Sequence, residues 1–213
     1  KGRLQSNYIP LIHCNQTQAE SYSPTLIRPM YPKKHAIIIP KNRREMLQHK
    51  YAEEWKIAEE VENENIRNHD TIEYIPTPKE PVHMLNSRYV YDIKTNEDGE
   101  ITKFKARLVV LGYDQRPNEY KETYAPVSQW TTIMMLMLVG WSLGMSTYVL
   151  DFKGAYLHAE RPNDTPIYLR TVGTMPTPAN TIPRVRKSLY GTVDAGNLWR
   201  KEVHELLIKC DYK

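Results

Sequence analysis

Apolar residues recur every three or four positions between residues 44 and 68, and charged residues fill most of the positions between them. This spacing predicts an amphipathic helix. Trp55, Ala58 and Glu62 share one face of that helix, and Tyr51 lies one turn before Trp55. We therefore expect the aromatic side of the helix to pack inward.

From residue 88 onward, side chains alternate between apolar and polar, as they do on the two faces of a β-strand. Tyr89, Tyr91 and Ile93 occupy one face, and a second alternating run covers residues 101–110. Asp98-Gly99 lies between the two runs, and this dipeptide is among the strongest signals for a hairpin turn. The sequence thus predicts a long antiparallel hairpin that ends at Gly112.

The second half of the chain predicts two helices and two short strands. Thr131 or Thr132 can cap a helix that runs to about Leu143 and ends at Gly144. The apolar run within it, residues 133–141, is interpreted as a buried helix. Strands are expected at residues 147–150 and 167–170, and a helix with one apolar stripe is expected at residues 195–209.

The remaining segments lack a sustained period. Residues 1–44 mix prolines with Asn, Gln and Ser, which predicts a poorly ordered leader. Within it, residues 36–39 could form a strand that Pro40 stops. Residues 71–83 contain three prolines and predict an extended connector.

Composition narrows the class of protein without assigning a function. The 213 residues are 40% hydrophobic and 25% charged, which is ordinary for a soluble globular protein. No apolar stretch reaches the roughly 18 to 20 residues of a membrane span. Cys14 and Cys210 lack partners at metal-ligand spacing, so neither a zinc site nor a disulfide framework is inferred. The formal net charge of +4 admits nucleic acid as a partner but is too small to establish one.

One carboxylate occupies a position suited to metal chemistry. Asp151 follows the predicted strand at residues 147–150 and precedes a turn at Gly154. Mg²⁺ prefers such hard oxygen ligands, and two Mg²⁺ ions can clamp the attacking and leaving oxygens of a phosphoryl transfer. The alternative is that Asp151 only caps the turn, and spacing alone favours this second interpretation.

Four ordered blocks of sequence resemble those of copia-type reverse transcriptases. Residues 105–115 are similar to the "KARLVAKGFTQ" block of that family, residues 120–127 to "YxETFAPV" and residues 150–157 to "LDVKTAFLNG". Residues 187–191, with Trp199 beyond them, are similar to "KSLYGLKQAPRAW". Residues 55–62 and 89–94 fit two further blocks upstream, so the resemblance covers about residues 45–213.

The resemblance implies a magnesium site at the strand end. Asp151 matches the first metal-binding aspartate of the polymerase palm, and the backbone carbonyl of Phe152 matches the neighbouring ligand. The family carries its paired catalytic aspartates in a later "YVDD"-type hairpin, whereas the 213 residues contain no Asp-Asp pair. Together with the missing initiator Met, this makes us expect a truncated chain that is inactive alone.

The resemblance also implies a nucleotide pocket. Lys105 and Arg107 match the basic residues of the fingers hairpin that hold the incoming triphosphate, although they can equally be solvated strand charges. Tyr156 matches the aromatic residue that selects deoxynucleotides, and it can also be a core aromatic. Tyr190 and Gly191 match the loop that shapes the pocket floor and grips the template.

The family pattern is disturbed directly after that loop. Where the family has "LKQAP", this chain has residues 192–196, so that a Lys and a Gln are missing and Asp194 is new. An acid beside a polyanion path would weaken binding, because such affinity depends on phosphate neutralisation.

The expected architecture is α+β, with polymerase-like fingers at residues 45–130 and an incomplete palm at residues 131–213, built from an antiparallel hairpin plus helices. The resemblance implies Mg²⁺, deoxynucleotides and an RNA/DNA primer–template as ligands, no membrane, and a cytoplasmic virus-like particle or the nucleus as location. One alternative is a retained nucleic-acid-binding or interaction module without catalysis. Another is a domain that no longer folds compactly and aggregates through an exposed sheet edge.

Overall fold

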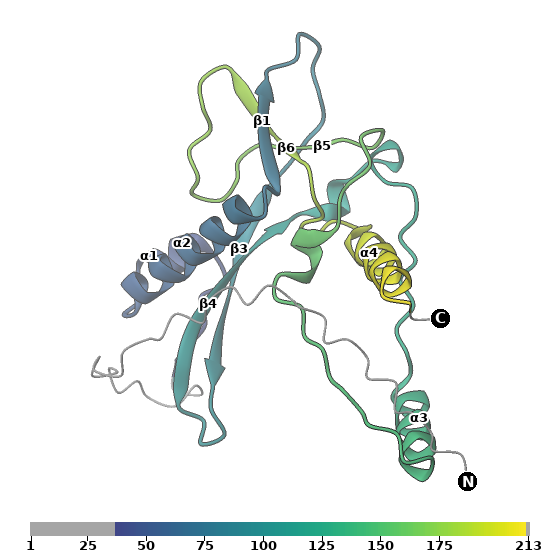
Figure 1. Cartoon of the computed structure of the whole chain (residues 1–213). Helices are drawn as coiled ribbons and strands as arrows, with labels where there is room; N and C mark the ends of the chain where they lie inside the picture. The colour runs from purple at the N-terminus through teal and green to yellow at the C-terminus, as the bar shows by residue number, and fades with distance from the viewer. Residues whose placement is uncertain (1–36, 212–213) are drawn as a thin grey trace. The chain divides into compact units, whose positions relative to one another are not determined.

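The computed structural model describes residues 37–211 and shows a mixed α+β architecture (Figure 1). Its elements follow in the order α1 (Arg43–Leu47), α2 (Ala52–Asn68), β1 (Ile72–Pro76), β2 (Met84–Leu85), β3 (Ser87–Thr95), β4 (Ile101–Val110), α3 (Trp130–Ser142), β5 (Ile167–Leu169), β6 (Thr181–Val185) and α4 (Ala195–Lys209). Short 3-10 turns lie at η2 (Gly112–Asp114), η3 (Pro117–Glu119) and η4 (Ala155–His158). The predicted α+β class is confirmed.

The predicted hairpin is formed by β3 and β4, which pair antiparallel. Tyr91 lies opposite Ala106 and Ile93 lies opposite Phe104, and all four side chains are buried. The turn between the strands contains Gly99 with a φ of 77°, a conformation that glycine adopts without steric cost. Successive side chains of a strand point to opposite faces, so one face of this hairpin is apolar and the other is charged.

Helix α2 covers the apolar face of the hairpin. Trp55 is fully buried, and its ring centroid lies 5.3 Å from that of Tyr91 and 4.7 Å from that of Phe104, in edge-to-face contacts. The inward-facing aromatic side is thereby confirmed. The single helix predicted for residues 44–68 is wrong, because α1 and α2 are separate. Between them the backbone N–H of Tyr51 donates to His49 Nδ1 at 3.1 Å, which replaces a helical hydrogen bond.

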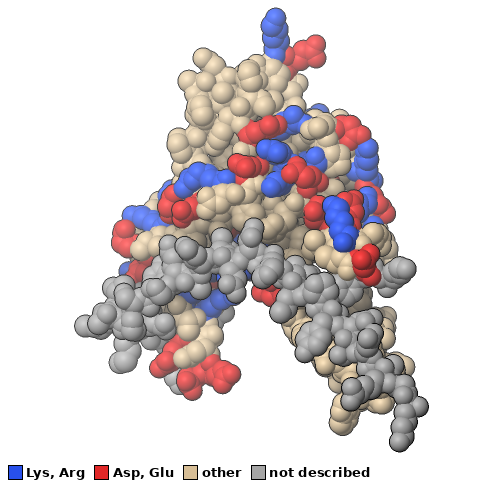
Figure 2. Space-filling model, in the orientation of Figure 1, with Lys and Arg blue, Asp and Glu red and all other residues tan. Residues whose placement is uncertain are grey.

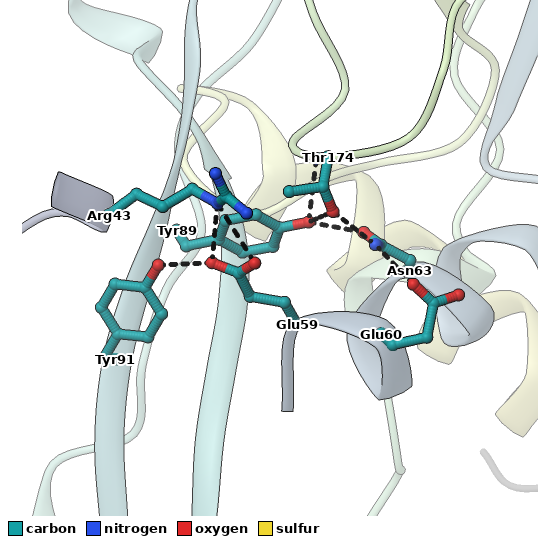
Figure 3. A network of polar contacts seen from close by, with 7 residues as sticks. All are labelled: Arg43, Glu59, Glu60, Asn63, Tyr89, Tyr91 and Thr174. Carbon is teal, nitrogen blue, oxygen red and sulfur yellow. Dashed lines mark hydrogen bonds and ion pairs between the residues drawn. The ribbon is translucent and has the colours of Figure 1, made fainter. Parts of the chain in front are cut away.

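A polar network joins α1 and α2 to the hairpin (Figure 3). The buried Glu59 carboxylate accepts a hydrogen bond from the Tyr91 hydroxyl at 2.5 Å, and Arg43 Nε lies 3.2 Å from each of its oxygens. Burial raises the pKa of Tyr91 above its ordinary value, and the adjacent Glu59 carboxylate raises it further. The network therefore satisfies a charge that would otherwise be costly to bury.

Tyr89 extends this network to the loop after β5. Its hydroxyl donates to Asn63 Oδ1 at 2.6 Å and accepts from the backbone N–H of Thr174 at 3.2 Å. The Asn63 amide in turn donates to Thr174 Oγ1 at 2.9 Å. Three segments distant in sequence are thus held at one buried hydroxyl, which Figure 3 shows between α2 and the loop.

The four-stranded sheet has the order β1-β6-β5-β2. Strands β1 and β6 are antiparallel, as are β5 and β6, whereas β2 and β5 are parallel. The segment predicted as an extended connector, residues 71–83, thus contains a paired strand. Strand β6 was not predicted because it contains Pro183. The proline is tolerated there because β5 pairs only with Arg184 and Val185, so β6 has one neighbouring strand at Pro183.

Residues 130–150 differ most from their prediction. The helix forms as α3 and Gly144 ends it with a φ of 68°, but none of its residues is buried, so the expected buried helix is wrong. Its N-cap is Gln129, without a side-chain hydrogen bond, and both candidate capping threonines lie inside the helix. Residues 147–150 form no strand, and Val149 is 92% exposed. A single segment cannot become a strand without a neighbour to pair with.

Strand β5 and helix α4 confirm the elements predicted at residues 167–170 and 195–209. Residues 37–39 are not a strand, and Ala36, like the rest of the predicted leader up to it, lies outside the described residues. Within the described range, no helix combines the length and the apolar character that crossing a bilayer requires.

Candidate functional site

The sequence blocks that are far apart in the chain meet at the end of β4. The backbone N–H of Val110 donates to the Tyr190 carbonyl at 2.8 Å, and the backbone N–H of Val193 donates to Gln115 Oε1 at 2.8 Å. Residues 105–115 are thereby fixed to the loop at residues 187–193. Sequence reasoning did not single out Gln115, although it is the last residue of the first block.

Two glycines make this contact possible. Gly191 has a φ of +89°, and a Cβ atom built on it would lie 2.1 Å from the Val110 carbonyl oxygen. A Cβ atom on Gly112 would lie 2.1 Å from the Gly191 carbonyl oxygen. Since real Cβ atoms do not approach backbone oxygens so closely, only glycine allows the two backbones to touch here.

Four of the predicted site residues form a cation–aromatic cluster, which we define as Lys105, Arg107, Tyr156 and Tyr190. The guanidinium carbon of Arg107 lies 5.9 Å from the centroid of the Tyr190 ring, within the range of a cation–π contact. The Tyr156 and Tyr190 rings lie 5.3 Å apart, centroid to centroid. All four side chains are half-buried, so each presents part of its surface to solvent.

Glu62 lies close enough to this cluster to interact with its charges. From the sequence alone, Glu62 is assigned to one face of a helix but not to the site. It is buried, and one carboxylate oxygen accepts from the backbone N–H of Leu108 at 3.1 Å. Burial raises the pKa of Glu62, while that hydrogen bond and the charges of Lys105 and Arg107 act in the opposite direction. The carboxylate supplies only one negative charge against two cations.

The two basic side chains of the cluster repel each other. Burial lowers the pKa of Lys105, and the positive charge of Arg107 lowers it further. Burial also raises the pKa of Tyr190, as does the nearby Glu62 carboxylate. An anion bound here would relieve the repulsion between the two cations.

The chemistry of the cluster suits a phosphorylated ligand with a planar ring. Arginine and lysine bind phosphate oxygens by charge-assisted hydrogen bonds, and tyrosine rings offer faces for stacking. On the face shown in Figure 2, basic and acidic groups are interspersed rather than gathered into one basic field. Attraction of an anion on that face is therefore local.

Asp151 and Phe152 lie in an irregular segment. Asp151 is exposed, and the Phe152 ring packs edge-to-face on Trp199 of α4 with 5.1 Å between centroids. Two Mg²⁺ ions need several converging carboxylates, but within residues 37–211 no group of three or more His, Cys, Asp or Glu side chains converges. The donor set around Asp151 among the described residues does not fit a two-metal site.

The interpretation of Asp194 as an acid beside a polyanion path is wrong. Its carboxylate is buried and accepts two hydrogen bonds from the Arg161 guanidinium, at 2.8 and 2.5 Å. Arg161 is also buried, and this desolvation lowers its pKa while Asp194 opposes the shift. Since the acid is paired and shielded from solvent, it does not repel a ligand at the surface.

Known proteins resemble this chain over most of its length. The family model described as reverse transcriptase (RNA-dependent DNA polymerase) matches residues 69–213. The retrovirus-related Pol polyprotein from transposon RE1 of Arabidopsis thaliana is 31% identical over 162 residues, which is 75% of this chain and 11% of the relative. The corresponding polyprotein from transposon TNT 1-94 of Nicotiana tabacum is 26% identical, over 87% of this chain and 14% of the relative.

A second Arabidopsis relative, the Pol polyprotein from transposon RE2, is 29% identical over 70% of this chain and 10% of its own length. The chain thus spans roughly a tenth of the length of the curated relatives it matches. No solved structure matches it. On the family match and these relatives, the chain belongs to the copia-type reverse transcriptases, the RNA-dependent DNA polymerase family of retrotransposon Pol polyproteins.

Proposed function

We propose that this chain holds the incoming nucleoside triphosphate and the primer–template of a reverse transcriptase, and that it does not extend a primer by itself. In this proposal residues 45–130 act as the fingers and residues 131–213 form part of the palm. The observation that carries it is the cation–aromatic cluster, in which Arg107 lies over the Tyr190 ring beside Lys105 and Tyr156.

Each member of the cluster has a distinct role in this proposal. Lys105 and Arg107 neutralise the triphosphate, because they are half-buried, lie on the same strand two residues apart and keep part of their surface open to solvent. Tyr156 contacts the sugar, where its ring discriminates against a 2′-hydroxyl. Tyr190 and Gly191 form the floor of the pocket, which the close contact with Val110 keeps rigid.

The lack of primer extension rests on the carboxylates. Nucleotidyl transfer in this family depends on divalent cations, and the full chain contains no Asp-Asp pair that could join Asp151 in holding Mg²⁺. Asp151 is exposed in an irregular segment. We therefore expect the chain to bind its ligands without catalysing nucleotidyl transfer. The lack of carboxylates around Asp151 among the described residues favours such a binding module.

The binding half is tested by titrating the 213-residue chain with a fluorescent deoxynucleoside triphosphate. We expect Lys105→Gln and Arg107→Gln each to weaken affinity by about tenfold, because each removes one charge-assisted phosphate contact. Lys103→Gln is the matched control, since it removes the same charge from an exposed position of the same strand, and its affinity should change less than about twofold. An equal loss of affinity in all three variants would show only a general effect of charge and would refute the proposed triphosphate pocket.

The catalytic half is tested by primer extension on an RNA template with Mg²⁺. We expect no extended product at concentrations where the triphosphate binds. Robust extension by the purified chain that Asp151→Asn abolishes would refute the proposed separation of binding from catalysis. Triphosphate binding and primer extension are measured in separate assays, so a negative result in one assay does not decide the other.

A further inference from the structure

Two histidines that are far apart in the sequence lie side by side at the end of α2. His69 directly follows α2, and His158 is the last residue of the 3-10 turn η4. Their ring centroids are 4.8 Å apart, and the ring planes are nearly perpendicular, at 88°. Neither residue belongs to the cation–aromatic cluster, so the pair is a feature that the proposed function does not use.

Backbone carbonyl groups fix which nitrogen of each neutral ring carries the hydrogen. His69 Nδ1 lies 2.7 Å from the Asn65 carbonyl oxygen, and His158 Nε2 lies 3.1 Å from the Lys153 carbonyl oxygen. A carbonyl oxygen only accepts, so these two nitrogens are the donors. The lone pair of each neutral ring is therefore on the other nitrogen, which is Nε2 in His69 and Nδ1 in His158. Histidines that bind metals show the same pattern, with one nitrogen on the metal and the other donating to a carbonyl or carboxylate.

The edge of the His69 ring that bears Nε2 faces the start of η4. A Cβ atom built on Gly154, the residue that caps η4, would lie 3.8 Å from both Cε1 and Nε2 of His69. Because glycine has no side chain, residue 154 leaves this edge uncovered. His69 is half-buried and His158 is exposed, so water and a small ion can reach the pair. The Trp199 ring flanks His158, with 6.4 Å between the centroids.

The spacing of the two rings matches that of two imidazoles that share one metal ion. A metal about 2.1 Å from a ring nitrogen lies about 3.2 Å from the ring centroid, so two rings that hold it at about 90° to 110° have centroids roughly 4.5 to 5.5 Å apart. The observed 4.8 Å falls within this range. No group of three or more His, Cys, Asp or Glu side chains converges anywhere in the described part of the chain, so water would complete the coordination shell.

We propose that His69 and His158 form a site for a divalent transition-metal ion of the class of Zn²⁺, Ni²⁺ and Cu²⁺, with His69 Nε2 and His158 Nδ1 as the two protein ligands. Imidazole nitrogen suits these ions, whereas Mg²⁺ prefers oxygen ligands. The site is thus different in chemistry from the Mg²⁺ site that the family resemblance implies. A bound ion ties the end of α2 to η4, the turn that also contains Tyr156.

The affinity of the site is measured by isothermal titration calorimetry of the untagged 213-residue chain with Zn²⁺, Ni²⁺, Cu²⁺ and Mg²⁺. We expect Cu²⁺ to bind most tightly, as the general order of metal affinities predicts, and excess Mg²⁺ not to compete. His69→Gln and His158→Gln should each weaken Zn²⁺ binding by at least about tenfold, since the loss of even an outer-shell partner of a metal site costs that much. The double variant should be little weaker than either single variant, because one remaining imidazole cannot chelate. His204→Gln, which removes an exposed histidine of α4, is the matched control and should leave the affinity unchanged.

The geometry of the site is tested on the unmodified chain, so this test does not depend on the folding of any variant. Substoichiometric paramagnetic Ni²⁺ should broaden the imidazole proton resonances of His69 and His158 in NMR spectra before those of His204. Zn²⁺ should also raise the thermal unfolding midpoint of the unmodified chain, because an ion that binds only the folded state stabilises it. That increase should be absent in the double variant, whose folding is checked by circular dichroism.

Three outcomes would overturn the proposal. The first is a chain that binds none of the three transition-metal ions, since the two rings would then only pack against each other. The second is metal binding that persists in the double variant, and the third is an equal loss of affinity in His204→Gln. All three are independent of triphosphate binding, which is measured with the Lys105 and Arg107 variants.

Discussion

Residues 52–110 and residues 130–150 are both rich in apolar and aromatic side chains, yet they fold with opposite results. In the first region Trp55, Tyr91 and Phe104 form a buried aromatic core between α2 and the hairpin. In the second region Trp130 and Trp141 are 71% and 80% exposed. The spacing of apolar residues therefore indicates which segments form helices or strands. Whether such a segment is buried depends on whether another apolar surface packs against it.

The physical cause lies in the distribution of apolar positions around each helix. Helix α2 has one apolar face and one charged face. The hairpin alone is therefore enough to cover its apolar face. Helix α3 has no charged face and contains no charged residue, which is typical of a helix buried on several sides, yet none of its residues is buried by the described part of the chain. Paired variants test this contrast, one in or directly against residues 52–110 and the other within residues 130–150.

The largest difference is expected between two tryptophans. Trp55→Ala should lower the free energy of unfolding by about 4 kcal/mol, because it removes a fully buried ring and leaves a cavity against Phe104. Trp130→Ala should change it by less than about 0.5 kcal/mol, since the ring is mostly exposed. Urea unfolding followed by circular dichroism measures both. Comparable losses would show that α3 is covered in solution and would remove the contrast.

The second difference concerns two glycines with positive φ. Gly191→Ala should cost about 3 kcal/mol, because the left-handed conformation and the clash with the Val110 carbonyl oxygen both oppose a side chain. Gly144→Ala has a similar φ but no atom within 4 Å, so it should cost only about 1 kcal/mol. The same unfolding assay applies, and equal costs would mean that the contact between Gly191 and β4 is not maintained.

The smallest difference concerns two tyrosines. Tyr91→Phe should cost about 2 kcal/mol near neutral pH, because the buried Glu59 carboxylate loses a hydrogen-bond donor. Tyr148→Phe should cost less than about 0.5 kcal/mol, since Tyr148 is 80% exposed.

The pH dependence of Tyr91→Phe sharpens this test. Folding raises the pKa of Tyr91 above its ordinary value of 10.0, so its contribution to stability is fully present below that pH and is lost as the pH rises further. The stability difference between the unmodified chain and Tyr91→Phe should therefore shrink above pH 10.0. A difference that grows in that range would contradict the hydrogen bond to Glu59.

Local signals predicted the elements that depend on neighbouring residues. The hairpin followed from alternation and an Asp-Gly turn, and α4 has the predicted bounds because its periodicity covers its whole length. The strand at residues 147–150 failed because pairing depends on another segment. Strand β6 was missed because Pro183 is a strand breaker unless the position has a free edge.

For the candidate site, resemblance selected residues that the fold does bring together. Lys105, Arg107, Tyr156 and Tyr190 come from three separate blocks and form one cluster. Their roles stay predictions until binding is measured. Glu62 could not be assigned from the sequence, because its place beneath the basic residues depends on the packing of α2 against β4.

The sequence by itself determined the family, the long hairpin and the amphipathic character of α2, because each is encoded in consecutive residues. Only the tertiary structure decided that Asp194 is neutralised by Arg161, that Gly191 touches β4 and that Asp151 has no converging carboxylates among the described residues. Those outcomes depend on distances between segments that are far apart in the chain, and no local pattern contains such distances.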